Sequence, residues 1–309
     1  MAFTMHSHSG QFCPGHAVDQ LEDIVQRAIA LGFTTMGLTE HMPRYEERDL
    51  YPEERDDPQQ SLAVLPLRHE AYLVEAQRLQ QKYASSIHII IGFEAEYIRS
   101  CFAPSVRELA QPPCVDYFIG SVHHVHSIPI DYDHDMFAAA VRAAGGSEER
   151  LYEDYYDLQF EMLTALEPKI VGHFDLIRLK SQHPGRDIRQ WTGVWQKVLR
   201  NLQLIRQQGG WLECNTAALR KGLEEPYPCR PIAEEWIAMG GQFTMSDDSH
   251  GIAQVSTNYT QGLSYLESLG VKTLWTFLRQ PQIGAPSSSK ARLLDKAVPV
   301  EEFRAHFKP

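Results

Sequence analysis

Residues 4–16 read TMHSHSGQFCPGH and place His6, His8 and His16 directly after the short apolar run AFTM (2–5). Such a run is typical of a buried strand. In an extended segment residues i and i+2 point to the same side, so His6 and His8 can direct both imidazoles at one ion. The stretch therefore predicts a strand with metal ligands directly after it.

The same alternation of apolar strands and helices continues along the chain. An amphipathic helix is expected over 18–32, and further helices around 73–79, 187–208 and 230–239. The apolar runs are nearly continuous, as in parallel strands covered on both faces, which indicates an α/β fold. Seven strands are predicted, at 2–5, 34–41, 87–96, 115–124, 169–177, 210–217 and 241–250.

Histidines and acidic residues gather where these strands end. In parallel α/β folds the C-terminal strand ends open onto one face, where binding sites form. Imidazole and carboxylate together suit Zn, Mn or Fe better than Ca or Mg. Ligands from so many strand ends converge only around a common point, which favours a TIM-barrel-like closed sheet over an open one. The candidates are His6, His8, His41, Glu94, His123, His173, Asp248 and His250.

Other histidines carry no such expectation. His124 adjoins His123 and must point elsewhere if the strand stays extended, whereas Glu96 could share the face of Glu94. The rest are expected to be ordinary core or surface residues: His69, His88, His126, His134, His183 and His306.

Composition excludes some partners. The 309 residues are 43% hydrophobic and 22% charged, enough for a sizeable core, and 29 basic against 40 acidic residues give a formal net charge of −11. Because a phosphate backbone would meet net repulsion, nucleic acid is a poor candidate partner. No apolar stretch approaches the ~20 residues of a membrane span.

Five scattered cysteines without a Cys-x-x-Cys pair indicate a reduced protein. No leader sequence is recognised, so a cytoplasmic location is expected. The charged, proline-rich segment 43–60 is expected to be a surface loop, either a lid or an insertion, and 143–150 another loop. No linker is visible, so 1–309 is predicted to be one domain. The oligomeric state stays open.

A series of short motifs resembles the polymerase and histidinol phosphatase (PHP) family of metal-dependent phosphoesterases. In chain order the motifs are HSH, PGH, TEH, GFEAE, GSVHH, GHFD and SDDSH. Within the family, the monofunctional histidinol-phosphate phosphatases are the most similar members. The motifs that carry this similarity are FCPGH, GSVHH, GHFDLIR and NTAALRKG. The match runs from Met5 to His250. It implies a distorted seven-stranded (β/α) barrel with three divalent metal ions at the C-terminal strand ends, and L-histidinol phosphate as substrate.

The resemblance also implies roles for single residues. Glu94 would bridge two metals, and Glu94, Asp248 and His250 are predicted to be catalytic. An extra Asp247 precedes the expected Asp-Ser-His and is interpreted as supporting its neighbours. By resemblance, His6, His8, Glu94 and Asp248 hold one metal, Glu94, His123 and His173 a second, and His16, His41 and His250 the third.

Phosphomonoester hydrolysis fits such a centre. A metal pair can lower the pKa of a bridging water from ~15.7 towards ~7 and so supply hydroxide for in-line attack, while a third cation binds phosphate oxygens. Arg178, Arg220 and Lys221 follow strands and are candidate phosphate ligands. The substrate also carries an ammonium group, for which Glu96, Asp175 and Asp247 are candidates.

Three alternatives remain. A phosphoesterase of the same family could act on nucleotides or other small phosphate esters. A metal-dependent amidohydrolase also begins with His-x-His, although Glu94 and the closing Asp-Ser-His favour the phosphoesterase. A non-catalytic metal-binding protein would be expected to have lost ligands, yet every expected position is filled.

Overall fold

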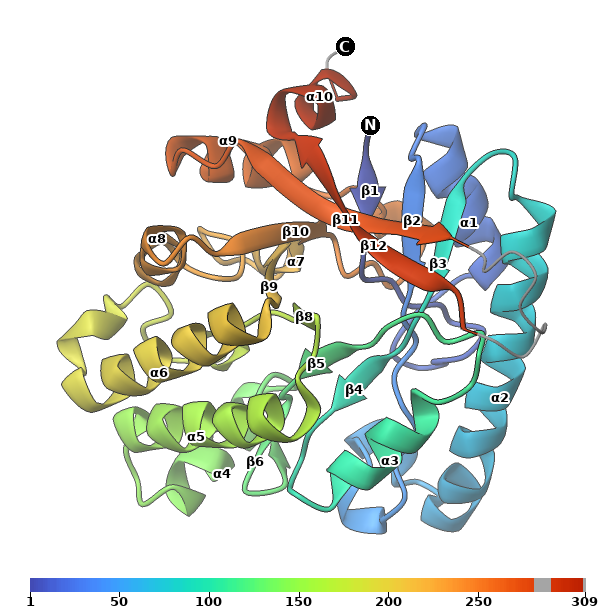
Figure 1. Ribbon diagram of the computed structural model, residues 1–309. Helices are drawn as coiled ribbons and strands as arrows, with labels where there is room; N and C mark the ends of the chain where they lie inside the picture. The colour runs from blue at the N-terminus through green and yellow to red at the C-terminus, as the bar shows by residue number, and fades with distance from the viewer. Residues whose placement is uncertain (281–289, 308–309) are drawn as a thin grey trace.

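The computed structural model describes residues 1–280 and 290–307, in which strands and helices alternate (Figure 1). The strands are β1 (Phe3–Thr4), β2 (Thr35–Leu38), β3 (His88–Ile91), β4 (Glu94–Glu96), β5 (Ile119–Ser121), β6 (His124–Val125), β7 (Ile128–Pro129), β8 (Ile170–Val171), β9 (Trp211–Asn215), β10 (Gln242–Ser246), β11 (Thr273–Gln280) and β12 (Arg292–Pro299). The α-helices are α1 (Leu21–Ala30), α2 (Pro58–Lys82), α3 (Phe102–Leu109), α4 (His134–Ala143), α5 (Glu148–Leu166), α6 (Thr192–Gln208), α7 (Ala217–Arg220), α8 (Arg230–Ala238), α9 (Tyr259–Ser268) and α10 (Val300–Ala305). Short 3₁₀ turns are η1 (Glu47–Asp49), η2 (Pro52–Glu54), η3 (Leu176–Arg178), η4 (Ile188–Gln190) and η5 (Ile252–Gln254).

Two mainly parallel sheets form the centre of the molecule. One has the order β1-β2-β3, and the other the order β12-β11-β10-β9-β8-β5-β4. All pairs are parallel except β11 with β12, and the short hairpin β6-β7 stands apart. The predicted α/β class with parallel strands is confirmed.

Backbone hydrogen bonds join the two sheets at both sides of the smaller one. After β1, the amide of Met5 donates to the carbonyl of Met245 on β10 at 3.2 Å. On the other side, the amide of Met42 donates to the carbonyl of Glu94 at 2.9 Å, and the amide of Glu94 donates to the carbonyl of Glu40 at 3.0 Å. The segments that follow β1 and β2 are therefore held next to β10 and β4.

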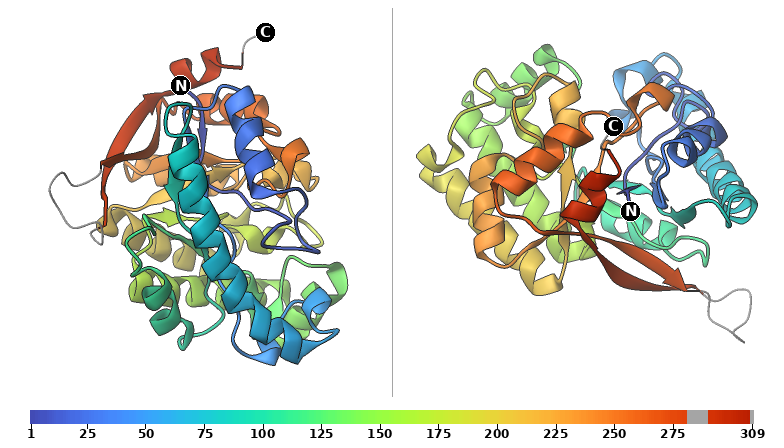
Figure 2. Two further views of the ribbon diagram at one scale, coloured as in Figure 1. Left: turned by 90° about the vertical axis from the view of Figure 1, so that its right-hand side faces the viewer. Right: turned by 90° about the horizontal axis from the view of Figure 1, so that it is seen from above.

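Helices cover the strands on two sides. In Figure 1, α1 and α2 lie on one side of the strands and α5, α6 and α8 on the other, and Figure 2 shows both chain ends near α10. The apolar stripe expected for α1 comprises Leu21, Ile24, Val25, Ala28 and Ile29; the first four are buried and Ile29 is half-buried. Apolar side chains from the strands and from the inner faces of the helices form one large core. Within the described residues, no helix has both the length and the apolar character needed to cross a membrane.

The predicted third strand, 87–96, is two strands in different sheets. Strand β3 pairs with β2, whereas β4 pairs with β5. Gly92 lies at the change of sheet, packed against Tyr117, where a Cβ would meet Cε1 of that ring at 2.7 Å. Only glycine therefore fits this close approach, which a hydrophobicity pattern does not reveal.

Parts of both expected loops are helical. Within 43–60 lie two 3₁₀ turns, and Pro58 starts α2, where the carboxylate of Asp57 caps the helix by accepting from the amide of Gln60 at 3.1 Å. Ser147 caps α5 in the same way within 143–150. The antiparallel β11-β12 hairpin was not predicted.

Candidate metal centre

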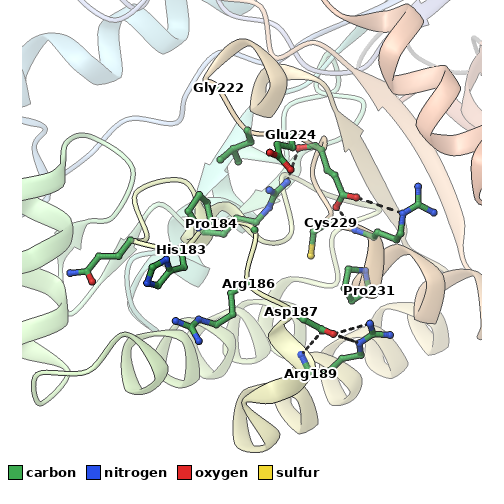
Figure 3. Close-up of a pocket in the computed structure, with 15 residues that line it drawn as sticks. His183, Pro184, Arg186, Asp187, Arg189, Gly222, Glu224, Cys229 and Pro231 are labelled. Carbon is green, nitrogen blue, oxygen red and sulfur yellow. Dashed lines mark hydrogen bonds and ion pairs between the residues drawn. The ribbon is translucent and has the colours of Figure 1, made fainter.

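A wide surface cavity lies close to one predicted phosphate ligand. It has a volume of about 750 Å³ and is lined by Arg178, His183, Arg186 and Cys229 among others (Figure 3). None of the predicted metal ligands lines it. The imidazole cluster is therefore a separate feature of the fold.

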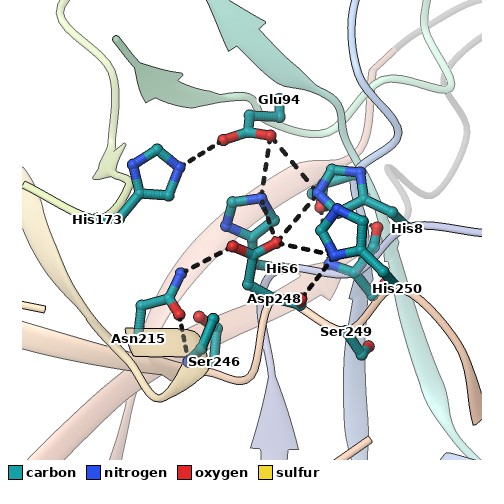
Figure 4. A network of polar contacts seen from close by, with 12 residues as sticks. His6, His8, Glu94, His173, Asn215, Ser246, Asp248, Ser249 and His250 are labelled. Carbon is teal, nitrogen blue, oxygen red and sulfur yellow. Dashed lines mark hydrogen bonds and ion pairs between the residues drawn. The ribbon is translucent and has the colours of Figure 1, made fainter. Parts of the chain in front are cut away.

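The predicted ligands come from segments that follow strands. His6 and His8 follow β1, and His41 follows β2. His123 follows β5 and His173 follows β8. Glu94 is the first residue of β4, three residues beyond the end of β3, and Asp248 and His250 follow β10. Residues far apart in the chain thus come to one place (Figure 4).

Three groups of ligand atoms result. In each group the candidate atoms lie within 4.8 Å of one another. His8 belongs to two groups, so the groups adjoin. They are His6, His8 and Asp248; Glu94, His123 and His173; and His8, His41 and His250.

Glu94 spans the groups with its two oxygens. Its Oε1 lies 2.9 Å from Nε2 of His173 and 3.3 Å from Nε2 of His123. Its Oε2 lies 3.3 Å from Nε2 of His6 and 3.0 Å from Nδ1 of His41. One carboxylate thus faces imidazoles of different groups.

The spacing fits metal ions better than direct hydrogen bonds. Nε2 of His6 and Nε2 of His8 are buried and have no hydrogen-bond partner among the described residues. They lie 3.6 and 3.3 Å from Oδ1 of Asp248. Because metal–nitrogen bonds are ~2.0–2.1 Å long, ligand atoms around one ion are roughly 3.0–3.5 Å apart. The donor set and its spacing therefore fit a divalent cation.

Electrostatics favour ionised carboxylates at the centre. Burial raises the pKa of Glu94, but the imidazoles of His6, His123 and His41 outweigh it and hold this pKa well below its ordinary value. The pKa of Asp248 is likewise held well below its ordinary value, because His6 and its neighbours outweigh burial. Ionised carboxylates are the form that binds a metal.

The histidines differ among themselves. Burial and the neighbouring His41 lower the pKa of His8 to about 3, so its imidazole is neutral. Burial would lower the pKa of His6 too, but Glu213, Asp248 and Glu94 raise it well above the ordinary value. A bound cation would compete for the site of that proton.

His16 lies at the edge of the cluster. Its side chain is 39% exposed, and its Nδ1 is 3.7 Å from Oε1 of Glu53. Its ring centroid lies 4.8 Å from that of His250 and 5.5 Å from that of His41. His16 is therefore near His41 and His250 but belongs to none of the three groups. The third member of the group that contains His41 and His250 is His8.

Arg178 is buried and contacts Tyr227, whose ring centroid lies 6.1 Å from that of His173. Its Nη2 donates to the carbonyls of Glu225 and Pro226 at 2.8 and 2.6 Å, and its Nε lies 2.9 Å from Oδ2 of Asp175. The guanidinium also lies over the ring of Tyr227, 5.1 Å from its centroid. Its Nη1 makes no hydrogen bond to the described residues.

The other two basic candidates lie next to the segment after β10. Arg220 donates from Nη1 and Nη2 to the carbonyls of Asp247 and Asp248, both at 2.9 Å. Lys221 is exposed. The pKa of the nearby His250 is held well below its ordinary value. Burial is the largest cause, and His8, His16 and Lys221 lower this pKa further.

The three carboxylates considered for an ammonium ion already have partners. Glu96 pairs with Nη1 of Arg44 at 2.9 Å. Asp175 pairs with Arg178 and accepts from the amide of Cys229 at 2.9 Å. The third, Asp247, accepts from the amides of Ser249 and Ser256 at 3.1 and 2.6 Å.

Some residues around the centre were not predicted. Glu213 on β9 lies 2.8 Å from Nδ1 of His6, and Asn215 lies 3.3 Å from Oδ2 of Asp248. Both belong to WLECN, where an acidic residue inside an apolar strand is the one signal that could have drawn attention to them. Segment 43–60 contributes Tyr51, whose ring is 6.0 Å from that of His16.

Fold and centre together define a class, namely α/β proteins that bind metal through imidazole and carboxylate groups after parallel strands. A model of the PHP domain family matches residues 4–217. The chain belongs to the PHP family.

Relatives cover nearly the whole chain. A "Probable histidinol-phosphatase" from Schizosaccharomyces pombe is 40% identical, with 91% of each chain covered. The histidinol-phosphatase of Saccharomyces cerevisiae is 31% identical, with 96% of each chain covered.

Two crystal structures resemble the fold. The hisK protein of Listeria monocytogenes, described as a candidate histidinol phosphatase, has a TM-score of 0.72 at 25% identity over 84% of this chain and 99% of its own. The histidinol phosphate phosphatase of Lactococcus lactis, complexed with zinc, L-histidinol and phosphate, has a TM-score of 0.64 at 18% identity over 89% and 96%. The second likeness concerns the fold alone.

Proposed function

We propose that this chain is a histidinol-phosphatase, a metal-dependent phosphomonoesterase that hydrolyses L-histidinol phosphate to L-histidinol and inorganic phosphate in histidine biosynthesis. The observation that carries the proposal is the meeting of three imidazole and carboxylate groups around Glu94. Relatives with 40% and 31% identity, both named as histidinol-phosphatases, support the substrate.

The two mainly parallel sheets can close into a barrel. We infer a distorted seven-stranded (β/α) barrel with the metal centre at the C-terminal strand ends. The hydrogen bonds that join Met5 to Met245 and Met42 to Glu94 support closure. We also keep the proposal of a single domain over 1–309, of which 281–289 and 308–309 lie outside the described residues.

The proposed centre holds three divalent ions, drawn from Zn, Mn or Fe. When bound, such ions supply a nucleophilic hydroxide and neutralise charge on the phosphoryl oxygens. The zinc in the Lactococcus lactis structure supports one of these metals. The proposed ligands remain His6, His8, Glu94 and Asp248 for one ion, Glu94, His123 and His173 for another, and His16, His41 and His250 for the last.

Side chains of the protein orient the proposed ligands. The Nδ1–H of His250 donates to the backbone carbonyl of Asp248 at 2.9 Å, which leaves Nε2 as its ligand atom. Arg220 holds the carbonyls of Asp247 and Asp248 and so fixes the segment that carries Asp248 and His250.

We propose that Arg178, Arg220 and Lys221 bind the phosphate. Nη1 of Arg178, which has no partner among the described residues, is the donor that Arg178 would use. The candidates for the substrate ammonium remain Glu96, Asp175 and Asp247. Each already has a partner, so an ammonium would share rather than replace those contacts.

The proposed partner is a small phosphate ester, not nucleic acid or a membrane. The net charge of −11 supports the first exclusion. Cytoplasmic location remains an expectation from the sequence. A nucleotide or another small phosphate ester is the alternative substrate.

Phosphate release by the metal-loaded protein tests the proposal. We expect catalytic efficiency on L-histidinol phosphate to exceed that on nucleotides and sugar phosphates by at least about 100-fold, equivalent to ~2.7 kcal/mol of differential transition-state binding. The Asp248→Asn variant is the control for contaminating phosphatase activity. A flat profile, or a preference for another ester, would discard the proposed substrate and keep the phosphoesterase chemistry.

A further inference from the structure

Glu213, in the middle of β9, has all of its hydrogen-bonding capacity used within the metal centre. Its side chain is fully buried. Oε1 lies 2.8 Å from Nδ1 of His6 and also accepts from the hydroxyl of Ser246. Oε2 accepts from the amide of His173 at 2.9 Å and from Nδ2 of Asn215 at 3.0 Å.

The first contact sets the tautomer of His6. A carboxylate can only accept, so the proton of the neutral imidazole lies on Nδ1. The lone pair is then on Nε2, which faces Oε2 of Glu94 at 3.3 Å and Oδ1 of Asp248 at 3.6 Å. Glu213 therefore selects the nitrogen of His6 that faces the other ligands.

The other contacts extend to both neighbouring strands. Strand β9 pairs with β8 on one side and β10 on the other, so Glu213 lies between the segments that carry His173 and Asp248. Its Oε2 holds the backbone of His173 and orients the side-chain amide of Asn215. That amide lies 3.3 Å from Oδ2 of Asp248 (Figure 4). One side chain thus contacts two of the three groups.

Only a carboxylate satisfies this environment. Four donors point at Glu213, two at each oxygen. Glutamine has the same shape, but its NH₂ would face one of two pairs. Facing the amides of His173 and Asn215, it would leave these donors without an acceptor; facing His6 and Ser246, it would require Nδ1 of His6 to accept and move the imidazole proton to Nε2. Unpaired buried donors cost ~1–3 kcal/mol each, so the pocket would rearrange around an amide.

We propose that Glu213 is a positioning residue that aims His6 and sets its spacing to the His173 segment, so that metal binding in both groups depends on it. This rests on the proposed metal centre but not on the identity of the ester. Outer carboxylates of this kind are typically worth 10–100-fold in metal affinity.

The test compares Glu213→Gln with the wild-type protein in metal-buffered titrations with Zn²⁺ and Mn²⁺. We expect at least two bound ions to weaken by 10–100-fold. With Co²⁺ as a probe, the ligand-field absorption spectrum should change, because His6 no longer presents Nε2 in the same direction. A purely structural role would instead lower the stability of the metal-free protein and leave affinity and spectrum unchanged, which would overturn the proposal.

Asp116→Asn is the matched control. Asp116 is also a buried carboxylate, but it accepts from the amide of Ile91 and from Arg279, away from the ligand groups. We expect this variant to lose stability and keep wild-type metal affinity. An equal loss of affinity in both variants would overturn a specific role for Glu213.

Glu213→Asp covers the case in which the glutamine variant does not fold. It keeps a carboxylate but moves the oxygens by one methylene, so we expect it to bind metal more weakly than the wild type. Wild-type affinity in this variant would overturn the proposal. The metal titrations need no substrate. A protein that binds metal but does not hydrolyse L-histidinol phosphate would therefore contradict the proposed function and leave the proposed role of Glu213 intact.

Discussion

Oε1 of Glu94 lies 2.9 Å from Nε2 of His173, while Oε2 of the same carboxylate faces His41 at 3.0 Å. We predict that Glu94→Gln lowers both metal content and catalytic efficiency, because an amide offers one acceptor where two are used. We expect at least about a 100-fold loss of kcat/KM, equivalent to ~2.7 kcal/mol. Metal analysis of the purified variant should show the loss of more than one equivalent. Full metal content would contradict a bridging role, and the exposed Glu108→Gln on α3 is the control.

Arg178→Ala should raise KM and reduce turnover without removing metal. Nη1, which makes no hydrogen bond to the described residues, is the proposed phosphate donor, and the guanidinium also holds the carbonyls of Glu225 and Pro226. A loss of about 10–100-fold in kcat/KM is expected for one charge-assisted contact. Steady-state kinetics with parallel metal analysis measures it, and unchanged kinetics would end the assignment to phosphate.

Removing the metals should destabilise the fold. Cations that bind only the folded state add ~2.7 kcal/mol when free metal is 100 times Kd. Thermal unfolding with and without a chelator should therefore differ at pH 8. The difference should shrink at pH 5, because protons compete with metal for histidine nitrogens. Equal melting curves with and without chelator at pH 8 would argue against a metal centre.

His69 provides a pH-dependent prediction outside the centre. Burial lowers its pKa to about 4, and neither ring nitrogen has a hydrogen-bond partner among the described residues. Its unfolded-state pKa is ~6.5, so below that pH the unfolded chain binds the extra proton and stability falls until about pH 4.

We therefore expect the free energy of unfolding of the metal-free wild type to fall by about 2 kcal/mol more than that of His69→Leu between pH 7.5 and pH 5. Leucine suits both the helical position in α2 and the contacts with Tyr72 and Phe93. Urea unfolding of both proteins at the two pH values measures the difference. Parallel pH dependence would show that His69 does not contribute.

Much of the fold was predictable because strands and helices leave local patterns. The stripe of α1 and the alternation of apolar strands needed only residues close in sequence. The split between β3 and β4 was not predictable, because it depends on Gly92 meeting Tyr117, which is distant in the chain. The α2 start at Pro58 was hidden by the charge of the surrounding segment.

The sequence by itself determined the α/β class and the chemical nature of the candidate ligands, because hydrophobic period and residue type are local properties. Tertiary structure alone decided how those ligands are grouped. It joined His8 with His41 and His250, left His16 at the edge and placed Glu213 behind His6. Such contacts depend on strand pairing across more than 200 residues, which no local pattern records.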